Sequence, residues 1–254
     1  MPEFAALGAV LGLAAAGWVV SLAKGNVNIV DSLWALFFVA AACAYTATGG
    51  AAGARAALVL AMACAWAVRL SGSLMARNWG EPEDRRYREI RTRNEPGFRW
   101  KSLYLVFCLQ ALLAWIIAFP LYAAISAGTP LNALDAAGFI LFAFGLAFEA
   151  AADWQLSRFR SVPANTGRVM DKGLWRYTRH PNYFGEACVW WGFYLVAVAA
   201  GAWWTVFAPL LMSFLLLRVS GVILLEKDIG TRRPAYREYT ARTNAFFPGP
   251  RRPV

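Results

Sequence analysis

The fold is decided by the stretch Asp171–Glu186, DKGLWRYTRHPNYFGE, in which a polar segment runs into a long apolar one. The polar part holds lysine and arginine side chains, two tyrosines and the only histidine of the chain. The apolar part begins at Tyr183 and continues to Leu225, so Glu186 is carried into it. A carboxylate inside a membrane segment is energetically costly, and Glu186 is therefore a candidate functional residue.

Apolar residues dominate the rest of the chain. Of its 254 residues, 59% are hydrophobic and 16% are charged, whereas soluble domains carry about 25% charged residues. The apolar residues form blocks of about 20, the length that crosses the hydrocarbon core of a bilayer. The composition therefore predicts an all-α, polytopic membrane protein and argues against a soluble helical core.

The cysteines and the first apolar block exclude other classes. The four cysteines lie inside apolar blocks without paired spacing. They are predicted to be small buried side chains, and with one histidine in the chain neither a disulfide nor a metal site is expected. The first block follows Glu3 without a basic leader and is long enough to span, so no signal peptide is expected.

Seven transmembrane helices are predicted within one integral membrane domain, residues 1–254. Five spans cover 4–23, 31–48, 56–76, 103–126 and 134–155. The run from Tyr183 to Leu225 is too long for one helix and supplies two further spans by breaking near 201–204.

Charge sets the predicted orientation. All lysines and arginines except Lys24, Arg55 and Arg69 lie in the segments 77–101, 158–179 and 218–254. Seven spans place these segments and Lys24 on one side, which the positive-inside rule assigns to the cytosol. The N-terminus is then outside and the C-terminus cytosolic. This topology and contacts with anionic lipid explain part of the net charge of +10. Richness in Ala, Gly and Arg indicates a bacterial source and hence the inner membrane.

Polar residues enter the first three spans at regular spacing. Asn28, Asp31 and Trp34 follow one another at i, i+3, so they share one face if that segment is helical. They either cap the second span or line a ligand site, and the second interpretation is favoured. In the third span Arg69, Ser73 and Arg77 form a polar stripe, unless Arg69 serves a structural ion pair with an intramembrane carboxylate. In the first span Gly8, Gly12 and Gly17 predict close helix packing.

Three further segments gather donors, acceptors and aromatic rings. The loop 77–87 interleaves Arg, Asn, Trp, Tyr and acidic residues, which favours a ligand role over a merely solvated loop. Asn182 and Glu186 stand at i, i+4, and His180 precedes a proline, so an Arg-His-Pro turn that only caps the sixth span is the alternative. The tail 226–248 is interpreted as a lid over the site, or alternatively as an interfacial amphipathic helix.

These side chains suit a nucleotide cofactor. Arginines bind phosphates bidentately, Tyr and Trp suit a planar ring, and Asn and Asp suit ribose hydroxyls or a carboxamide. The apolar interior suits a lipid-soluble co-substrate. The sequence therefore predicts a cofactor that enters from the cytosol and a hydrophobic small-molecule substrate that arrives through the bilayer. Membrane lipid is the other expected partner. No nucleic-acid partner is expected, and no oligomer is indicated.

Two motifs carry a resemblance to a known family. Residues 172–177 (KGLWRY) and 179–186 (RHPNYFGE) resemble the signature shared by membrane steroid 5α-reductases, sterol reductases and isoprenylcysteine methyltransferases. The segment 25–34 (GNVNIVDSLW) and the motif Glu83-Asp84-x-Arg86-Tyr87 resemble bacterial relatives of 3-oxo-5α-steroid 4-dehydrogenase, and the tail Tyr236-x-x-Tyr239…Phe247-Pro248 is similar too.

The resemblance implies NADPH as the reductant. It places Asn182 and Glu186 against the nicotinamide and its ribose, and Arg160 and Arg168 on the phosphates. The other cofactor-binding positions that follow from the resemblance and from the polar loops are Arg77, Asn78, Asp84, Arg86, Tyr87, Asp153, Tyr177, Arg179, His180, Tyr236 and Tyr239.

The expected reaction is reduction of the C=C bond of a conjugated enone, as in conversion of a 3-oxo-Δ4-steroid to its 5α-reduced product. A donor beside the ketone stabilises the enolate, and a carboxyl in an apolar pocket can serve as that donor. The candidates are Asp31, Asn28, Glu186 and Tyr183; the third span lacks the tyrosine that the steroid enzymes use. Two alternatives are a membrane methyltransferase that uses S-adenosylmethionine on an isoprenylcysteine or phospholipid, and a non-enzymatic lipid-binding protein.

Overall fold

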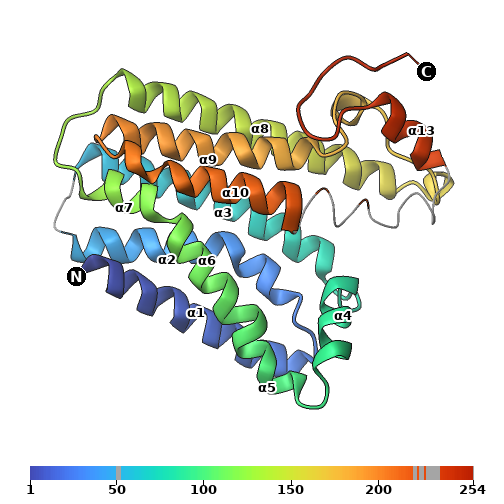
Figure 1. Cartoon of the computed structure of the whole chain (residues 1–254), viewed down its shortest axis with the longest axis horizontal. Helices are drawn as coiled ribbons and strands as arrows, with labels where there is room; N and C mark the ends of the chain where they lie inside the picture. The colour runs from blue at the N-terminus through green and yellow to red at the C-terminus, as the bar shows by residue number, and fades with distance from the viewer. Residues whose placement is uncertain (50–52, 220–221, 223–225, 227–234, 254) are drawn as a thin grey trace. The chain divides into compact units, whose positions relative to one another are not determined.

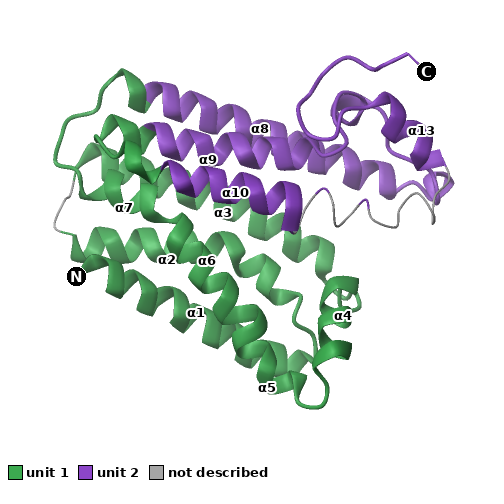
Figure 2. Ribbon diagram, viewed as in Figure 1, with its two compact units in different colours: residues 1–135, 196–205 green, residues 136–195, 206–254 purple. Residues whose placement is uncertain are grey.

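All regular secondary structure in the part of the chain that the structure describes is helical. The computed structural model describes residues 1–49, 53–219, 222, 226 and 235–253, and no β-strand occurs among them (Figure 1). The prediction of an all-α protein is therefore confirmed. Two compact units divide the chain (Figure 2): unit 1 comprises residues 1–135 and 196–205, and unit 2 comprises 136–195 and 206–254.

Unit 1 is a bundle built on its second helix. Helix α1 (Pro2–Lys24) packs on α2 (Ile29–Thr48), and α2 packs on α3 (Ala54–Asn78). The short turn between α1 and α2 is possible because Gly25 ends α1 with φ 64°. The remaining elements are α4 (Arg85–Asn94), α5 (Phe98–Ser102), the π-helical η1 (Leu103–Cys108), α6 (Leu109–Ile117), α7 (Phe119–Ser126) and the 3₁₀ turn η4 (Trp203–Val206), which unit 2 shares at its last residue.

Unit 2 is organised around two long helices. These are α8 (Ala133–Arg160), whose first residues belong to unit 1, and α9 (Pro181–Ala199), whose last residues do. The shorter elements are the 3₁₀ turns η2 (Pro163–Asn165) and η3 (Gly173–Arg176), α10 (Phe207–Phe214), the π-helical η5 (Leu215–Val219) and α13 (Ala235–Arg242).

Glycines bring the backbones of α8 and α9 into contact. A Cβ atom added at Gly145 would lie 2.6 Å from the carbonyl oxygen of Gly185, and one added at Gly192 would lie 2.8 Å from the carbonyl oxygen of Gly138. Small residues permit this close approach between helices in a membrane. The glycine of the Asn-x-x-Gly-Glu motif is thus required by packing.

The packing predicted for the glycines of α1 is only partly observed. A Cβ at Gly17 would collide with the Leu33 side chain of α2. Nothing in the described part of the chain lies within 4 Å of a Cβ added at Gly8 or Gly12. Gly17 therefore makes the close contact with α2, and Gly8 and Gly12 make no such contact.

Five helical segments in the described residues are long and apolar enough to cross a membrane: α1, α2, α3, Phe98–Ile117 and α8. The protein is therefore an integral membrane protein by the length and composition of its helices. The fourth span was predicted to end at residue 126, but the helix begins at Phe98 and breaks at Ala118, because Pro120 follows and has no N–H to donate. The predicted break near 201–204 is confirmed, since α9 ends at Ala199 and Gly201 has φ 84°.

A buried ion pair closes one end of unit 1. Arg55 is 2% exposed, and its Nε and one terminal nitrogen each donate to a carboxylate oxygen of Asp135 at 2.8 Å. The guanidinium also donates to the carbonyl oxygens of Thr129 and Pro130. The sequence indicated only that Arg55 was an isolated cation; the structure shows that it anchors the loop that leads into α8.

Candidate functional site

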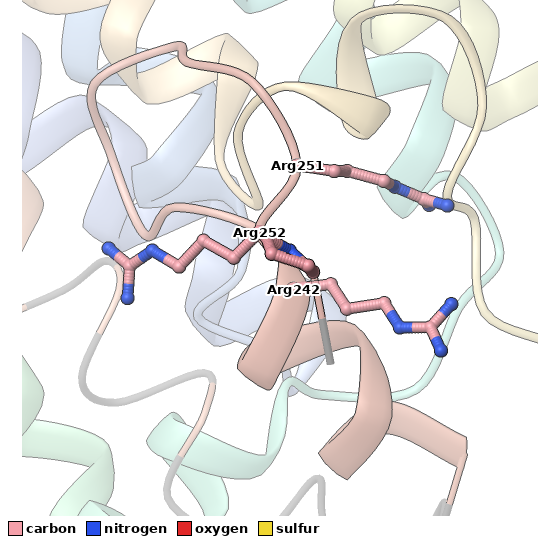
Figure 3. Close-up of a pocket in the computed structure, with 4 residues that line it drawn as sticks. Arg242, Arg251 and Arg252 are labelled. Atoms are coloured by element: carbon pink, nitrogen blue, oxygen red, sulfur yellow. The ribbon is translucent and has the colours of Figure 1, made fainter.

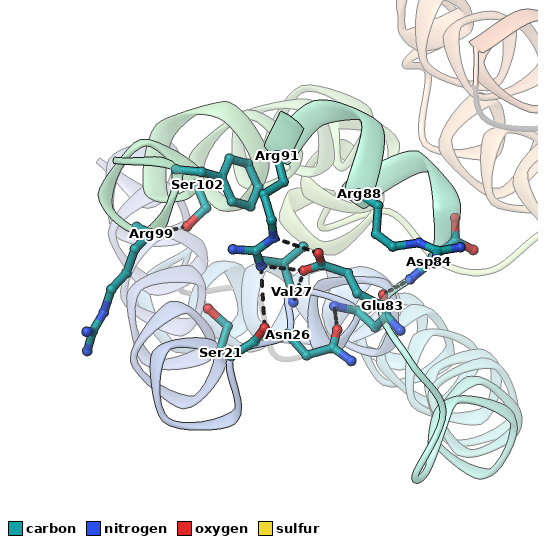
Figure 4. Close-up of polar contacts among 12 residues, drawn as sticks. Ser21, Asn26, Val27, Glu83, Asp84, Arg88, Arg91, Arg99 and Ser102 are labelled. Atoms are coloured by element: carbon teal, nitrogen blue, oxygen red, sulfur yellow. Dashed lines mark hydrogen bonds and ion pairs between the residues drawn. The ribbon is translucent and has the colours of Figure 1, made fainter. Parts of the chain in front are cut away.

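The polar residues of unit 1 meet where the α1–α2 turn faces the loop before α4. We call this set the junction cluster. Its members come from the turn and start of α2, from the loop and α4, and from α6, and part of it is drawn in Figure 4: Asn28, Asp31, Glu83, Asp84, Arg86, Tyr87, Arg91 and Gln110.

Asn28 joins the turn to the loop. Its side-chain N–H₂ donates to the carbonyl oxygen of Pro82 at 3.1 Å, and its side-chain oxygen accepts from the backbone N–H of Asp84 at 2.8 Å. The residue is 6% exposed and occupies the cap position of α2, but its side chain makes no capping bond to that helix. Asn28 is therefore neither a simple cap nor an open amide: both of its side-chain groups hold the loop.

Asp31 lies within the same cluster and is bound on both oxygens. Arg86 donates to one oxygen at 3.0 Å, and the Tyr87 hydroxyl donates to the other at 2.5 Å. Gln110 donates to the Tyr87 oxygen at 3.2 Å, which orients the phenol proton toward Asp31. Burial and the negative charge of Asp31 raise the pKa of Tyr87 well above its ordinary value. Tyr87 is consequently a neutral hydrogen-bond donor at physiological pH.

Two further carboxylates fix the loop and α4. Glu83 accepts two bonds from Arg91, at 2.7 and 2.8 Å, and one from the backbone N–H of Val27 at 3.1 Å (Figure 4). Burial raises the pKa of Glu83, but the hydrogen bonds from Arg91 and Val27 lower it overall. Asp84 caps α4 by accepting from the N–H of Arg86 at 2.9 Å. Here too burial opposes ionisation, yet the bonds and charge of Arg86 lower the pKa of Asp84.

The end of α3 contributes little to this cluster. Arg77 is exposed and donates to the neighbouring Asn78 side chain at 3.3 Å, a long hydrogen bond. Trp79 is exposed as well, and the Lys24 ammonium lies 5.3 Å from the centre of its ring. Arg77 and Asn78 thus remain available to solvent-borne groups.

In unit 2, the residues before α9 bind the C-terminal tail. We call this set the tail clasp; it comprises Trp175, Thr178, Arg179 and His180 with Glu226, Tyr236, Tyr239, Thr243, Asn244 and Phe246. Residues 227–234 of the predicted lid lie outside the described residues. The described later part of this tail contacts the stretch 175–180, as the bonds below show.

Arg179 and His180 converge on Glu226. Arg179 forms a bidentate pair with the Glu226 carboxylate, at 2.7 and 2.9 Å, and His180 Nε2 lies 2.9 Å from the same carboxylate. The other terminal nitrogen of Arg179 donates to the carbonyl oxygen of Thr243 at 2.6 Å. Burial raises the pKa of Glu226, but the hydrogen bonds from His180 and Arg179 lower it to about 2. Arg179 and His180 therefore hold the C-terminal tail against the segment before α9.

Backbone and tyrosine contacts complete the tail clasp. The Arg179 N–H donates to the carbonyl oxygen of Asn244 at 2.9 Å, and the Thr178 hydroxyl donates to that of Phe246 at 2.8 Å. The hydroxyl of Tyr239 donates to the carbonyl oxygen of Trp175, and that of Tyr236 donates to Glu226 at 3.3 Å. Tyr236 and Tyr239 were predicted to bind the cofactor. Both are buried, and their hydroxyls donate to groups of the protein itself.

The first turns of α9 carry the motif residues. Asn182 Oδ1 is buried and accepts no hydrogen bond among the described residues. Glu186, one turn later, is 7% exposed. Tyr183 stacks its ring on His180 with the ring centres 5.6 Å apart and the planes 6° from parallel. Between Asn182 and Glu186, Gly185 packs closely against the backbone of Glu149 on α8.

Comparison with known proteins identifies the family. Residues 17–243 match the family described as "Protein of unknown function (DUF1295)". The chain belongs to the DUF1295 family. That family includes steroid 5α-reductase-like proteins. The DUF1295 chain is also 27% identical, over 91% of its own length and 75% of the relative's, to the uncharacterized protein C594.04c of Schizosaccharomyces pombe. No solved structure matches it.

The remaining predicted positions of this DUF1295 protein lie along the end of α8 and the loop after it. Asp153 is half-buried on α8, Arg160 is the exposed last residue of that helix, and Arg168 is exposed in the loop. Tyr177 is 47% exposed at the end of η3. These four positions belong to unit 2, as do Asn182 and Glu186.

Three partners in the DUF1295 protein were not predicted as site residues. Gln110 had a signal, because it is an amide inside an apolar predicted span, where polar residues have a partner or a function. Glu226 and Arg91 had none, because the sequence does not show which opposite charge each would meet. The pairs that they form, with Arg179 and Glu83, come from the tertiary fold.

Proposed function

We propose that the protein is an NADPH-dependent reductase of the C=C bond in a conjugated enone, with a hydrophobic, steroid-like substrate such as a 3-oxo-Δ4-steroid. The supporting observation is Asn182, whose side-chain oxygen is buried without a hydrogen-bond donor in the described residues. A primary carboxamide, such as that of nicotinamide, offers the N–H that this oxygen lacks. NADPH supplies a hydride when it is bound.

The residues of unit 2 fit such a cofactor. Asn182 accepts from the carboxamide, and the buried Glu186, one turn along α9, accepts from ribose hydroxyls. Arg160 and Arg168 are exposed arginines suited to phosphate groups. Arg179 and His180 act indirectly: through Glu226 they hold the tail against the segment that leads into α9.

The group proposed to hydrogen-bond the ketone oxygen is the Tyr183 hydroxyl, which follows Asn182 on α9. A neutral phenol can donate to an oxygen on which negative charge develops. The Tyr87 hydroxyl of unit 1 is not that donor, because its one proton is given to Asp31. Asp31 and Gln110 fix the direction of the Tyr87 hydroxyl within the junction cluster. Asn28 holds the loop that carries α4 and hence Tyr87.

We further propose a seven-span topology in a bacterial inner membrane, with the N-terminus outside and the mouth of the site facing the cytosol. Helix α9 and the shorter apolar helix Trp203–Val219 supply the two spans beyond the five above. Single cysteines at Gly128 and Gly97, in a chain whose native cysteines are replaced by alanine, test the orientation. A membrane-impermeant thiol reagent should label only the first in intact cells; labelling of only the second would reverse the topology.

Hydride transfer tests the reaction directly. Purified protein in detergent is incubated with a 3-oxo-Δ4-steroid and NADPH deuterated at the reactive position of the nicotinamide ring, and deuterium in the reduced product is measured by mass spectrometry. Deuterium should appear at the β-carbon of the enone. Thermal unfolding with NADPH, NADH and S-adenosylmethionine is recorded in parallel; stabilisation by S-adenosylmethionine alone would overturn the reductase and favour a methyltransferase.

The Asn182→Ala variant tests the supporting observation. The NADPH concentration that gives half-maximal thermal stabilisation should rise about tenfold, because one hydrogen bond buried in the complex is lost. Asn165→Ala is the matched control, since it removes the same side chain and one hydrogen bond, that to the carbonyl oxygen of Phe159, from a half-buried position in the turn η2 of unit 2. Equal NADPH binding by the two variants would contradict the assignment of Asn182.

A further inference from the structure

The C-terminal tail forms a basic pocket that the reductase proposal does not use. The pocket has a volume of about 440 Å³ and is lined by Arg242, Arg251, Arg252 and Pro253. The end of α13 and the last residues of the tail are tied together there, because the Arg252 N–H donates to the carbonyl oxygen of Arg242 at 2.9 Å. Figure 3 shows the side chains of Arg242 and Arg251 extending to the same side, with Arg252 directed away from them.

Acidic and amide groups hold the arginines only in part. Arg242 pairs with Glu238 at 2.9 Å and Arg251 with Asp171 at 2.7 Å, in each case through a terminal nitrogen. The Nε atoms of Arg242 and Arg251 are both buried, and within the described residues neither has a hydrogen-bond acceptor. A buried donor without an acceptor is unfavourable. Two such donors on guanidinium groups that extend to one side fit the oxygens of a phosphate.

The surroundings favour a phosphate at the membrane surface. Phe247, four residues before Arg251, is 71% exposed. Its ring packs edge-on against Phe184 of α9, which packs in turn against Phe148 of α8. An exposed aromatic ring beside arginines, packed against a helix of membrane-spanning length, is typical of a protein surface that lies at the level of the lipid headgroups.

We propose that Arg242 and Arg251 bind the phosphodiester of an anionic phospholipid headgroup, with Phe247 beside its acyl chains. Each guanidinium donates its Nε–H to a phosphate oxygen while its terminal nitrogen keeps the ion pair with Glu238 or Asp171. This site is separate from the proposed reductase chemistry and does not depend on it.

The experiment measures lipid binding by the full chain in micelles of a neutral detergent. Phosphatidylglycerol is titrated, phosphatidylcholine serves as the neutral lipid, and inorganic pyrophosphate and NADPH serve as soluble phosphates; the midpoint of thermal unfolding is recorded. Phosphatidylglycerol alone should raise the midpoint through this site. In the Arg242→Gln variant, the half-saturating lipid fraction should rise about fivefold.

Arg237→Gln is the matched control, because it removes the same charge from an exposed position of α13 outside the pocket. The partner of Arg242, Glu238, is 63% exposed, so the loss of that pair has little effect on folding. Arg251→Gln should reproduce the effect of Arg242→Gln. Equal lipid responses in Arg242→Gln and Arg237→Gln would show a general surface attraction and overturn the proposal. So would stabilisation by pyrophosphate or NADPH that is lost in Arg242→Gln, since the site would then belong to a soluble phosphate.

Discussion

Glu226 is the residue on which the tail clasp depends. It accepts hydrogen bonds from Arg179 and lies against His180, so its replacement by glutamine removes the negative charge and one of the two acceptor oxygens. The Glu226→Gln variant should lose about 3 kcal/mol of unfolding free energy, the equivalent of lowering the pKa from 4.5 to about 2. Thermal or denaturant unfolding in detergent measures this loss. Glu238→Gln, which removes an exposed carboxylate from α13, should change stability by much less.

The same carboxylate predicts a pH dependence. Because the folded-state pKa of Glu226 is lowered, its contribution to stability is fully present above about pH 4.5 and is lost as pH falls from 4.5 toward 2. Unfolding midpoints of the natural chain and of Glu226→Gln should therefore converge over that range. A difference that stays constant down to pH 2 would contradict the assigned ion pair.

Asn28 has a comparable role in unit 1. The Asn28→Ala variant removes both bonds to the loop before α4 and leaves the Asp84 N–H and the Pro82 carbonyl without partners, at a cost of about 2 kcal/mol. Asn78→Ala loses only a long bond to Arg77 and should be nearly neutral. Unfolding of the two variants in the same detergent compares them. A larger loss in Asn78→Ala would mean that Asn28 does not hold the loop.

At the scale of helices, glycines that lie against the backbone of a neighbouring helix differ from glycines in open surroundings. Gly192→Ala should destabilise the protein by about 2 kcal/mol or more, because the new methyl group meets backbone that cannot move aside. Gly12→Ala, in open surroundings on α1, should instead be neutral or stabilise by about 0.5 kcal/mol through helix propensity. The free energy of unfolding in detergent is the measurement, and equal effects would contradict the close contact.

Helices were more predictable than the bonds between them. Apolar length alone predicted α1, α2, α3 and α8 near their observed bounds. The break before Pro120 could have been predicted from that proline, whereas the pair of Arg55 with Asp135 joins residues far apart in sequence and had no local signal. Likewise, Asn28 and Asp31 were expected to cap the second span or to line a ligand site, and their partners in the loop and α4 follow only from tertiary folding.

For the whole molecule, the C-terminal tail is predicted to protect the stretch 175–180 from proteolysis. A chain truncated after Thr243 loses the hydrogen bonds that the carbonyl oxygens of Asn244 and Phe246 accept from that stretch and the one that the Gly249 N–H donates to it. Trypsin should then cleave after Arg176 and Arg179 at a much higher rate, as measured by mass spectrometry of the fragments. A chain truncated after Pro253 keeps these bonds and serves as the control. Equal cleavage of the two chains would contradict a protective tail.

The tail clasp also has a consequence for biosynthesis. Residues 177–179 form hydrogen bonds with residues 244–249, which are synthesised only after α9 and α10. Before residues 244–249 leave the ribosome, α8 and α9 can already be inserted in the membrane, but the segment between them has no tail to bind. The segment that leads into α9 therefore reaches its final form only after residues 244–249 have been made. Until then, quality-control proteases would meet an open segment that the finished protein conceals.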